Sequence, residues 1–399
     1  MTAVYVITAD GQVHFREGPQ GGSQPGPAGI TRDLGWTLTR LAQLSGPMTL
    51  VYDRDPGGGT STVPELATVA GWDCKGPAQG PWWTAYQDGR RGRTVTIGVR
   101  EYAKPEDLMI APHMPPELVR DSLFRWAAAT GTAYSHSPGV AAINNLRDGP
   151  HPIYNVQWRL IDGRNVMPWK PPAQINDIRW ESMPGNLYAG PTARYDLRSA
   201  YLAALAAVDL PRLKLSATGH YRDAAGYFRI RCQHALINML GRRDRQGTTW
   251  VCHPVARQLD DLGVPFEVIE SHTAPATRIL RPWGEAWRDI LAGAAPEDRI
   301  LYKRAYSEAV GMLNVSRGRV YRPDWRHMII DQVRASMLRR AWSAWRLCGI
   351  LPARIDVDSM WFAVDFNIHQ NLDQLGAAVG VGDQAGRMRF EGITEGAAR

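Results

Sequence analysis

Two acidic motifs, far apart in the chain, restrict most strongly what this sequence can fold into. Residues 193–196 form a short strand-like run that ends in Asp196, and a helix-like run begins at once at Leu197. Residues 352–364 have the pattern of a β-hairpin with Asp356 and Asp358 at its tip, where alternation places both acids on one side. Two carboxylates on one tight hairpin repel each other, and a divalent cation commonly makes such a pair tolerable.

Each acidic motif also has an ordinary structural interpretation. Asp is a common helix N-cap, so Asp196 could simply begin the following helix. Turns favour Asp, so the hairpin could be structural as well. The junction before the helix nevertheless suits a cation, because one carboxylate can bind the ion while N–H groups at the helix start meet phosphate oxygens.

A third motif lies between the two acidic ones, in residues 300–311, whose pattern is helical. Lys303, Ser307 and Gly311 follow one another at intervals of one turn and therefore share a face. One basic residue beside small neighbours would leave room for a triphosphate and a base against the helix. A lysine that contacts only solvent is the alternative interpretation.

The composition suits a polyanionic partner without requiring one. The 399 residues include 46 basic and 39 acidic side chains, which give a net charge of +7, and the pI is near 9.3. This length allows two or three domains with a well-buried core. Four scattered cysteines without a CxxC pair predict reduced thiols rather than a zinc cluster or a disulfide framework: Cys74, Cys232, Cys252 and Cys348.

The sequence shows no sign of a membrane protein. Its first residues lack the basic and apolar regions of a signal peptide, and no run of about 18 apolar residues occurs. We therefore expect a soluble, cytoplasmic protein without a membrane partner.

Residues 1–146 are predicted to form a small α/β domain. Three short runs rich in β-branched residues are typical of strands: 4–7, 48–52 and 94–99. Four leucines have the spacing of a helix packed on a sheet: Leu34, Leu38, Leu41 and Leu44. A second helix is expected after Pro116, with Leu118, Leu123 and Trp126 facing inward and Gly131 at its end.

The order and spacing of the three motifs resemble those of family B (α-like) DNA polymerases, in particular compact phage or plasmid types. Asp196-x-x-Ser199-x-Tyr201 is similar to the family's DxxSLYP. Asp356-Val357-Asp358-Ser359 is similar to its DTDS. The segment from Lys303 to Gly311 resembles KxxxNSxYG, with Ser307 and Val310 in place of the asparagine and tyrosine.

The resemblance implies an α+β fold. A right-hand palm, made of an antiparallel sheet with helices, would carry helical fingers and would follow a small α/β exonuclease-like domain of the RNase H type. The implied boundaries are 1–146 for a degenerate exonuclease-like domain, 147–190 for a linker, 191–275 for the first part of the palm, 276–322 for the fingers and 323–399 for the second part of the palm. A long palm helix is expected from Pro323 to Gly349, with five residues facing inward: Ile330, Val333, Met337, Ala341 and Trp345.

The resemblance also implies three groups of site residues. Asp196 and Asp358 would be catalytic and would bind two Mg²⁺ or Mn²⁺ ions, with Leu197 as a further ligand. The nucleotide would contact Arg198, Ser199, Ala200, Tyr201, Arg288, Lys303 and Ser307. Primer–template DNA would contact Asp356, Arg317, Arg319, Arg387 and Arg389.

Individual roles follow from the same resemblance. Backbone amides of residues 198–200 would hold the β- and γ-phosphates. Tyr201 would lie under the deoxyribose and exclude a 2′-hydroxyl. Lys303 would meet a phosphate together with a second basic residue, either Arg288 or Arg299. Arg322 and Arg326 would also lie on the phosphate track. Arg334, Arg339 and Arg340 would lie either on this track or on a solvated helix face.

Two departures from the family pattern matter. About 40 residues follow Asp358, so the thumb is expected to be minimal or absent, and a terminal protein or accessory protein could substitute for it. The first strand ends in Ala9-Asp10-Gly11-Gln12 and lacks the DxE pair of a proofreading exonuclease. The sequence therefore predicts a DNA-directed DNA polymerase that adds dNTPs without proofreading.

Two other functions stay open at this point. One is a catalytically silent protein for replication initiation or telomere DNA binding, which would use the palm as a scaffold. The other is a primase or a template-independent transferase. Asp196, Asp358 and Lys303 together favour catalysis, because a scaffold needs none of them.

Overall fold

The structure is a computed structural model that describes residues 3–17, 33–41, 48–57, 62–76, 81–87, 94–105, 107–150, 190–218, 224–234, 246–316, 320–363 and 372–394, with short pieces between 153 and 181. The fold mixes α and β structure, as predicted. The chain divides into two compact units. The first comprises Met1–Pro152 and Ile290–Ala309, and the second comprises Ile153–Asp289 and Val310–Arg399. Among the described helices, none is both long and apolar enough to span a membrane.

The first unit is built on a six-stranded mixed sheet with the order β2-β1-β3-β6-β5-β4. Its strands are β1 (Ala3–Ile7), β2 (Val13–Glu17), β3 (Met48–Tyr52), β4 (Asp73–Lys75), β5 (Trp82–Tyr86) and β6 (Thr94–Val99). β1, β3 and β6 are parallel, and the outer strands are antiparallel to their neighbours. The three predicted strands are confirmed, because their β-branched residues form the buried centre of this sheet.

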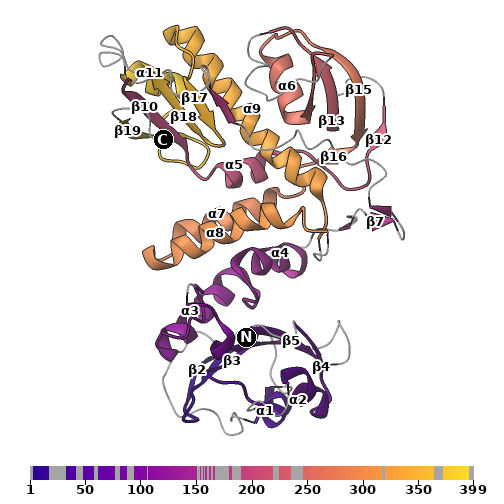
Figure 1. The fold of residues 1–399 in the computed structure, drawn as a ribbon, viewed down its shortest axis with the longest axis vertical. Coiled ribbons are helices and arrows are strands. Elements are labelled where there is room, and N and C mark those ends of the chain that lie inside the picture. The colour runs from indigo at the N-terminus through magenta and orange to yellow at the C-terminus, as the bar shows by residue number, and fades with distance from the viewer. Residues whose placement is uncertain are drawn as a thin grey trace. The chain divides into compact units, whose positions relative to one another are not determined.

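The helices of the first unit are α1 (Leu34–Leu41), α2 (Val63–Val69), α3 (Pro116–Thr130) and α4 (Pro138–Asp148), with a short 3₁₀ turn, η2 (Arg100–Tyr102). In α1, Leu34, Leu38 and Leu41 are buried, which confirms the predicted stripe. Leu44 lies outside the described residues. Figure 1 shows α1 and α2 on one side of the sheet.

The second predicted helix, α3, ends as expected at Gly131, which has the left-handed φ of 71° typical of a helix C-cap. Leu123 and Trp126 are buried, but the inward position predicted for Leu118 is wrong, because this side chain is 44% exposed. The buried stripe runs through Val119, Leu123 and Trp126, at i, i+4 and i+7. Leu118 lies off this line.

The predicted helix at 300–311 is confirmed as α8 (Pro296–Met312). Its first part belongs to the first unit and is bound there by side chains. Asp298 accepts from Nε of Arg125 at 2.6 Å, and the ring of Tyr302 stacks on Trp126 with 5.7 Å between centroids. Because Lys303 and Ser307 lie on this stretch, contacts within the first unit fix their backbone.

The second unit contains two antiparallel sheets beside one long helix, α9 (Pro323–Cys348). The five-stranded sheet has the order β19-β10-β18-β17-β9. It consists of β9 (Arg179–Glu181), β10 (Thr192–Leu197), β17 (Arg354–Asp356), β18 (Ser359–Ala363) and β19 (Met388–Thr394). The four-stranded sheet, with the order β12-β15-β13-β14, consists of β12 (Ser216–Ala217), β13 (Ala225–Arg231), β14 (Thr248–Cys252) and β15 (Glu267–Ala274).

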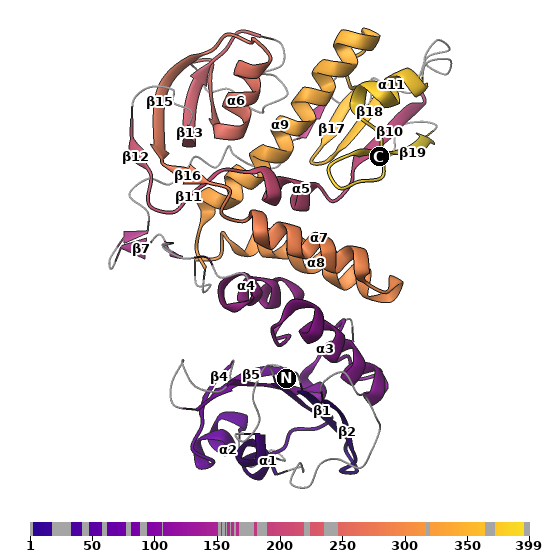
Figure 2. The ribbon, with the colours of Figure 1, turned by 180° about the vertical axis from the view of Figure 1, so that it is seen from behind.

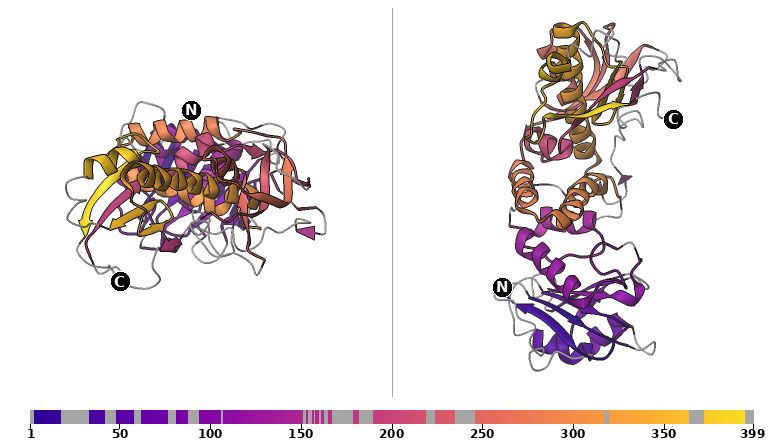
Figure 3. Two further views of the ribbon diagram at one scale, coloured as in Figure 1. Left: turned by 90° about the horizontal axis from the view of Figure 1, so that it is seen from above. Right: turned by 90° about the vertical axis from the view of Figure 1, so that its left-hand side faces the viewer.

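Figures 1 and 2 show α9 between these two sheets, and Figure 3 gives two further views of the same unit. The other helices of the unit are α5 (Ala200–Ala207), α6 (His253–Asp261) and α11 (Leu372–Val379), and α7 (Arg281–Gly293) begins in it. Two short pairs complete the strands: β7 (Ile161–Asp162) with β8 (Asn165–Val166), and β11 (Leu210–Pro211) with β16 (Ala276–Thr277). Helices α5, α6 and α11 all pack against α9.

The long helix begins and ends where the sequence predicts. Pro323 occupies its first turn, and Gly349 closes it with a φ of 70°. Four of the five residues predicted to face inward are buried, namely Ile330, Val333, Met337 and Ala341, but Trp345 is 44% exposed.

The prediction of a solvated basic face on α9 is wrong for two of its three arginines. Arg334 and Arg340 are buried, because sheets and helices pack around α9 on several sides and leave it little free surface. Arg334 donates to Asp331 at 2.9 Å, and Asp331 in turn accepts the backbone N–H of Cys252 at the end of β14. These charges therefore hold α9 to the four-stranded sheet.

Candidate functional site

The two acidic motifs lie side by side at one end of the five-stranded sheet. β10 and β18 are antiparallel neighbours, and Asp196 stands opposite Ser359 in their register. The backbone N–H of Leu197 donates to the carbonyl oxygen of Asp358 at 2.8 Å. On the other side of β18, Ser359 stands opposite Asp356 in β17. Sheet pairing thus brings Asp196 and the Asp356–Asp358 tip together.

The alternation of β10 decides which face of the sheet carries the acids. Ala193, Tyr195 and Leu197 are buried, and the ring of Tyr195 lies against Phe362 and Phe390. The residues between them are only partly buried and point to the opposite face. Directly opposite residues of antiparallel strands share a face, so one row on this face contains Arg389, Asp196, Ser359 and Asp356.

The tip of the hairpin differs from the alternating pattern expected for it. Asp356 is the last residue of β17, whereas Val357 and Asp358 form the two-residue turn. Alternation therefore does not set the direction of the Asp358 side chain, and the placement of both acids on one side stays a prediction. Val357 has a φ of 54°, which is strained for a β-branched residue.

The helix after Asp196 begins later than predicted. Leu197 still belongs to β10, where it stands opposite Met388, and α5 begins only at Ala200. Ser199 precedes α5 with φ 47° and ψ 49°, a left-handed conformation. Ser199 and Val357 are two of the three non-glycine residues with positive φ in the described part of the chain. Such strain costs about 1–3 kcal/mol per residue and gathers at functional sites.

Two arginines that the sequence analysis missed neutralise the acids. Nη2 of Arg194 lies 3.3 Å from Oδ1 of Asp196, which also accepts the hydroxyl of Ser359. Nη2 of Arg354 lies 2.9 Å from Oδ2 of Asp356. Each arginine precedes its acid by two residues in the same strand, and this i, i+2 spacing was the signal available in the sequence.

The turn between β10 and α5 is fixed by the segment that enters β19. The N–H of Arg198 donates to the carbonyl oxygen of Arg387 at 2.9 Å, and the N–H of Gly386 donates back to Arg198 at 2.8 Å. Among the backbone groups assigned to phosphates, that of Arg198 is therefore bonded within the protein. The side chain of Arg198 pairs with Asp383 at 3.4 Å.

A buried cation lies next to this turn. Arg340 of α9 is 6% exposed, and its Nη2 donates to the carbonyl oxygen of Gly386 at 2.5 Å. Burial, with smaller contributions from the charges of Arg339 and Arg387, lowers the pKa of Arg340 to about 10. Arg340 therefore does not lie on the predicted phosphate track or solvated face, because its guanidinium is buried and bonded to the carbonyl oxygen of Gly386.

The other predicted nucleotide residues divide between the two units. Ala200 is buried and Tyr201 is half-buried in the first turn of α5, in the second unit, and Arg288 is exposed on α7. Lys303 is exposed and Ser307 half-buried on the part of α8 that belongs to the first unit. The roles of Lys303, Ser307 and Arg288 at the acids stay predictions. Arg317 and Arg319, predicted to contact DNA, lie outside the described residues.

The acids suit a magnesium site that is completed by water and substrate better than a metal site made only of protein ligands. Across the described ranges, no group of three or more His, Cys, Asp or Glu residues could hold a metal. Mg²⁺ commonly binds one or two carboxylates and fills its other positions with water and substrate phosphates. Main-chain pairing places Asp196 next to the turn that carries Asp358, and their role as such a pair stays a prediction.

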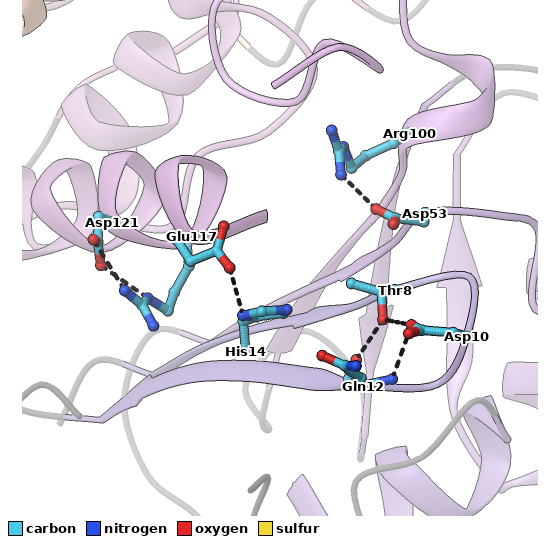
Figure 4. Close-up of polar contacts among 9 residues, drawn as sticks. Thr8, Asp10, Gln12, His14, Asp53, Arg100, Glu117 and Asp121 are labelled. Atoms are coloured by element: carbon cyan, nitrogen blue, oxygen red, sulfur yellow. Dashed lines mark hydrogen bonds and ion pairs between the residues drawn. The ribbon is translucent and has the colours of Figure 1, made fainter. Parts of the chain in front are cut away.

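The acids that Figure 4 labels in the first unit engage in local pairs. Asp53 binds Nη1 of Arg100 at 2.5 Å, and Glu117 lies 3.3 Å from Nδ1 of His14. Asp10 accepts from the Thr8 hydroxyl in the turn after β1. The absence of a proofreading activity stays a prediction.

Comparison with known proteins gives matches at the level of structure alone. No protein-family model matches the chain, and no curated protein sequence matches it. The chain is similar to Phi29 DNA polymerase complexed with primer-template DNA and incoming nucleotide substrates, with 9% identity and a TM-score of 0.47 over 98% of this chain and 85% of that one. For the post-translocation binary complex of Phi29 DNA polymerase with primer-template DNA, the identity is 11% and the TM-score 0.45, over 99% of this chain and 84% of that one. For the family B DNA polymerase of the archaeon Pyrobaculum calidifontis, the identity is 14% and the TM-score 0.32, over 99% of this chain and 56% of that one.

Proposed function

We propose that this protein is a DNA-directed DNA polymerase of the family B type, which adds dNTPs to a primer 3′ end by two-metal catalysis and does not proofread. One observation carries the proposal. The pairing of β10 with β18 holds Asp196 of the DxxSxY motif beside Asp358 of the DxDS motif, through a main-chain hydrogen bond between Leu197 and Asp358. Phosphoryl transfer depends mainly on positioning and charge neutralisation, so two fixed carboxylates are its central requirement.

Asp196 and Asp358 would hold the metal ions, with Leu197 as a further ligand. Bound Mg²⁺ or Mn²⁺ lowers the pKa of the attacking hydroxyl and neutralises charge on the triphosphate. The protein's own part is to fix the carboxylates and to orient them. The hydroxyl of Ser359 donates to Oδ1 of Asp196, and Arg194 donates to the same oxygen. Both contacts restrict the orientation of the Asp196 carboxylate.

The nucleotide would lie over the turn that leads into α5. Ser199 and Ala200 offer backbone N–H groups at the start of this helix, where the helix dipole favours phosphate. Arg198 adds a side-chain cation, and Arg288 of the same unit would make a further triphosphate contact. Tyr201, in the first turn of α5, would pack under the sugar and exclude a 2′-hydroxyl.

Primer–template DNA would approach the same face of the five-stranded sheet. Arg389 stands in the same register row as Asp196, and Arg387 lies just before β19, so both can reach the primer backbone. Asp356, in the adjoining strand, would face the primer end. A terminal or accessory protein would be a further partner that helps to hold the duplex.

Primer extension tests this proposal. Purified protein receives a labelled primer on a template, the four dNTPs, and Mg²⁺ or Mn²⁺. We expect extension by the wild type and none by Asp358→Asn, which keeps size but removes charge. Asp260→Asn changes an exposed acid on α6 and should extend normally. Parallel reactions with unprimed template and without template distinguish a primase and a transferase. No incorporation in any reaction would contradict catalysis and favour a DNA-binding scaffold.

A further inference from the structure

A tryptophan lies between two arginines in the register row next to the acids. Trp361 of β18 stands opposite Arg194 of β10 on one side and Arg354 of β17 on the other. The guanidinium carbon of Arg354 is 4.9 Å from the indole centroid, and that of Arg194 is 5.3 Å from it. Both distances are within the range of a cation–π contact. We refer to these three residues as the Arg–Trp–Arg stack.

The stack lies on the same face as the acids and is open to solvent. Two residues along a strand cover about 6.7 Å and return to the same face, so this row is parallel to the row of Asp196, Ser359 and Asp356. The side chains of Arg194 and Arg354 are each 42% exposed, whereas those of Asp196 and Asp356 are 26% exposed. Positive charge therefore reaches further into solvent than the neighbouring negative charge does.

This arrangement has the chemistry of a site for a nucleic-acid backbone. A guanidinium that is held flat against an indole loses less freedom when it binds phosphate, and its planar fork of donors matches phosphate oxygens. The rise of a nucleic-acid strand is about 3.4 Å per nucleotide. If a strand ends at the acids, one of its phosphates would therefore lie over the stack, within about two nucleotides of the strand's end.

We propose that the Arg–Trp–Arg stack binds the phosphate backbone of the primer strand, one or two nucleotides behind the 3′ end that reacts at Asp196 and Asp358. This inference rests on the proposed function where it calls the bound strand a primer. Binding of the phosphate backbone to the stack does not itself require polymerase activity. Trp361 is a positioning residue that keeps both guanidiniums in place. Arg194 and Arg354 serve the acids as counter-ions until nucleic acid binds.

Binding measurements without metal separate this role from a purely structural one. The anisotropy of a fluorescein-labelled primer–template is measured with wild-type protein and with Arg354→Gln in EDTA, at several NaCl concentrations. Arg231→Gln is the matched control, because Arg231 is 46% exposed and is also paired with a carboxylate, Glu267, but lies on the other sheet. Trp361→Phe and Trp361→Leu test the support of the stack.

We expect Arg354→Gln to bind DNA about tenfold more weakly at low salt, as the loss of one charged hydrogen bond predicts. The slope of log Kd against log salt should also fall by about 0.7–0.9, the value for one phosphate contact. Trp361→Leu should weaken binding, and Trp361→Phe should largely restore it. Equal slopes for Arg354→Gln, Arg231→Gln and wild type, with all three proteins folded by circular dichroism, would overturn the proposal.

The same samples distinguish failure of this inference from failure of the proposed function. Asp358→Asn should lose primer extension and keep the wild-type salt slope. If the wild type does not extend primers, yet Arg354→Gln still lowers the slope, the stack binds nucleic acid in a protein that is not a polymerase. If extension occurs and the slope is unchanged, the polymerase proposal stands and the stack has only a structural role.

Discussion

The backbone N–H of Leu197 donates to the carbonyl oxygen of Asp358 at 2.8 Å, and this one hydrogen bond closes the β10–β18 ladder at the end where the acids lie. Main-chain pairing thus fixes the separation of the two acidic segments before any side chain or cation contributes. Such a frame keeps the two acidic segments adjacent although their side chains carry like charges, which repel each other.

Strain at the hairpin tip should be measurable. Val357 has a φ of 54°, and asparagine tolerates this conformation far better than a β-branched residue. We expect Val357→Asn to raise the free energy of unfolding by about 1 kcal/mol, the lower end of the usual range for such strain. Urea denaturation measures the change. Val315→Asn, at a 41% exposed loop valine without positive φ, should give no gain. Equal effects at both positions would refute stored strain at Val357.

Tyr201 should control the choice of sugar if the proposed function is right. Its ring lies in the first turn of α5, which directly follows the strand and turn that carry Asp196. We expect Tyr201→Ala to raise the ratio of kcat/KM for ribonucleotides to that for deoxyribonucleotides by roughly 10- to 100-fold, because the steric barrier is removed. Tyr201→Phe keeps the ring and should keep the selectivity. An unchanged ratio in Tyr201→Ala would show that another residue selects the sugar.

Local patterns in the sequence predicted the elements whose signals are strong and continuous. The β-branched runs of β1, β3 and β6, the hairpin of Asp356 and Asp358, and α9 from Pro323 to Gly349 all appear in the structure. In each case the residues that set the local conformation, such as proline in the first helical turn or glycine at the C-cap, are neighbours in the chain.

Features set by pairing between distant strands could not be read from spacing alone. Leu197 continues β10 because Met388 stands opposite it, although the local pattern favours a helix from this residue. The position of Trp361 between Arg194 and Arg354 depends on the register of three strands, and a shift of one residue would separate them. The burial of Arg340 depends in the same way on what surrounds α9.

A buried ion pair near the start of α9 should be essential for stability. Arg322 and Asp324 are both fully buried, so the predicted place of Arg322 on a phosphate track is wrong. Nη2 of Arg322 lies 2.7 Å from Oδ2 of Asp324 and 2.6 Å from the carbonyl oxygen of Pro211. Asp324→Asn leaves a buried guanidinium without its counter-ion, so we expect a loss of about 3–5 kcal/mol. Glu285→Gln breaks the exposed Arg281–Glu285 pair and should leave the urea midpoint almost unchanged, because solvent screens such a pair. Comparable urea midpoints for the two variants would contradict this assignment.

A buried histidine links α9 to the four-stranded sheet. Nδ1 of His327 lies 2.9 Å from the hydroxyl of Tyr227 in β13, and the imidazole is 9% exposed. Burial, with smaller contributions from the charges of Arg326 and Arg334, lowers the pKa of His327 from 6.5 to about 4. The folded protein therefore keeps this ring neutral at pH values where an unfolded chain would protonate it.

This difference predicts a loss of stability in acid. Between pH 6.5 and about 4 the unfolded state binds a proton at His327 that the folded state does not, so the contribution is complete above pH 6.5 and falls as the pH drops towards 4. The loss amounts to about 3 kcal/mol at most. We expect the unfolding free energy of His327→Gln, measured by urea denaturation, to fall less steeply than that of the wild type across this window. His113→Gln, at an exposed histidine, should follow the wild-type curve. Parallel curves for all three proteins would show that His327 is protonated in the folded state.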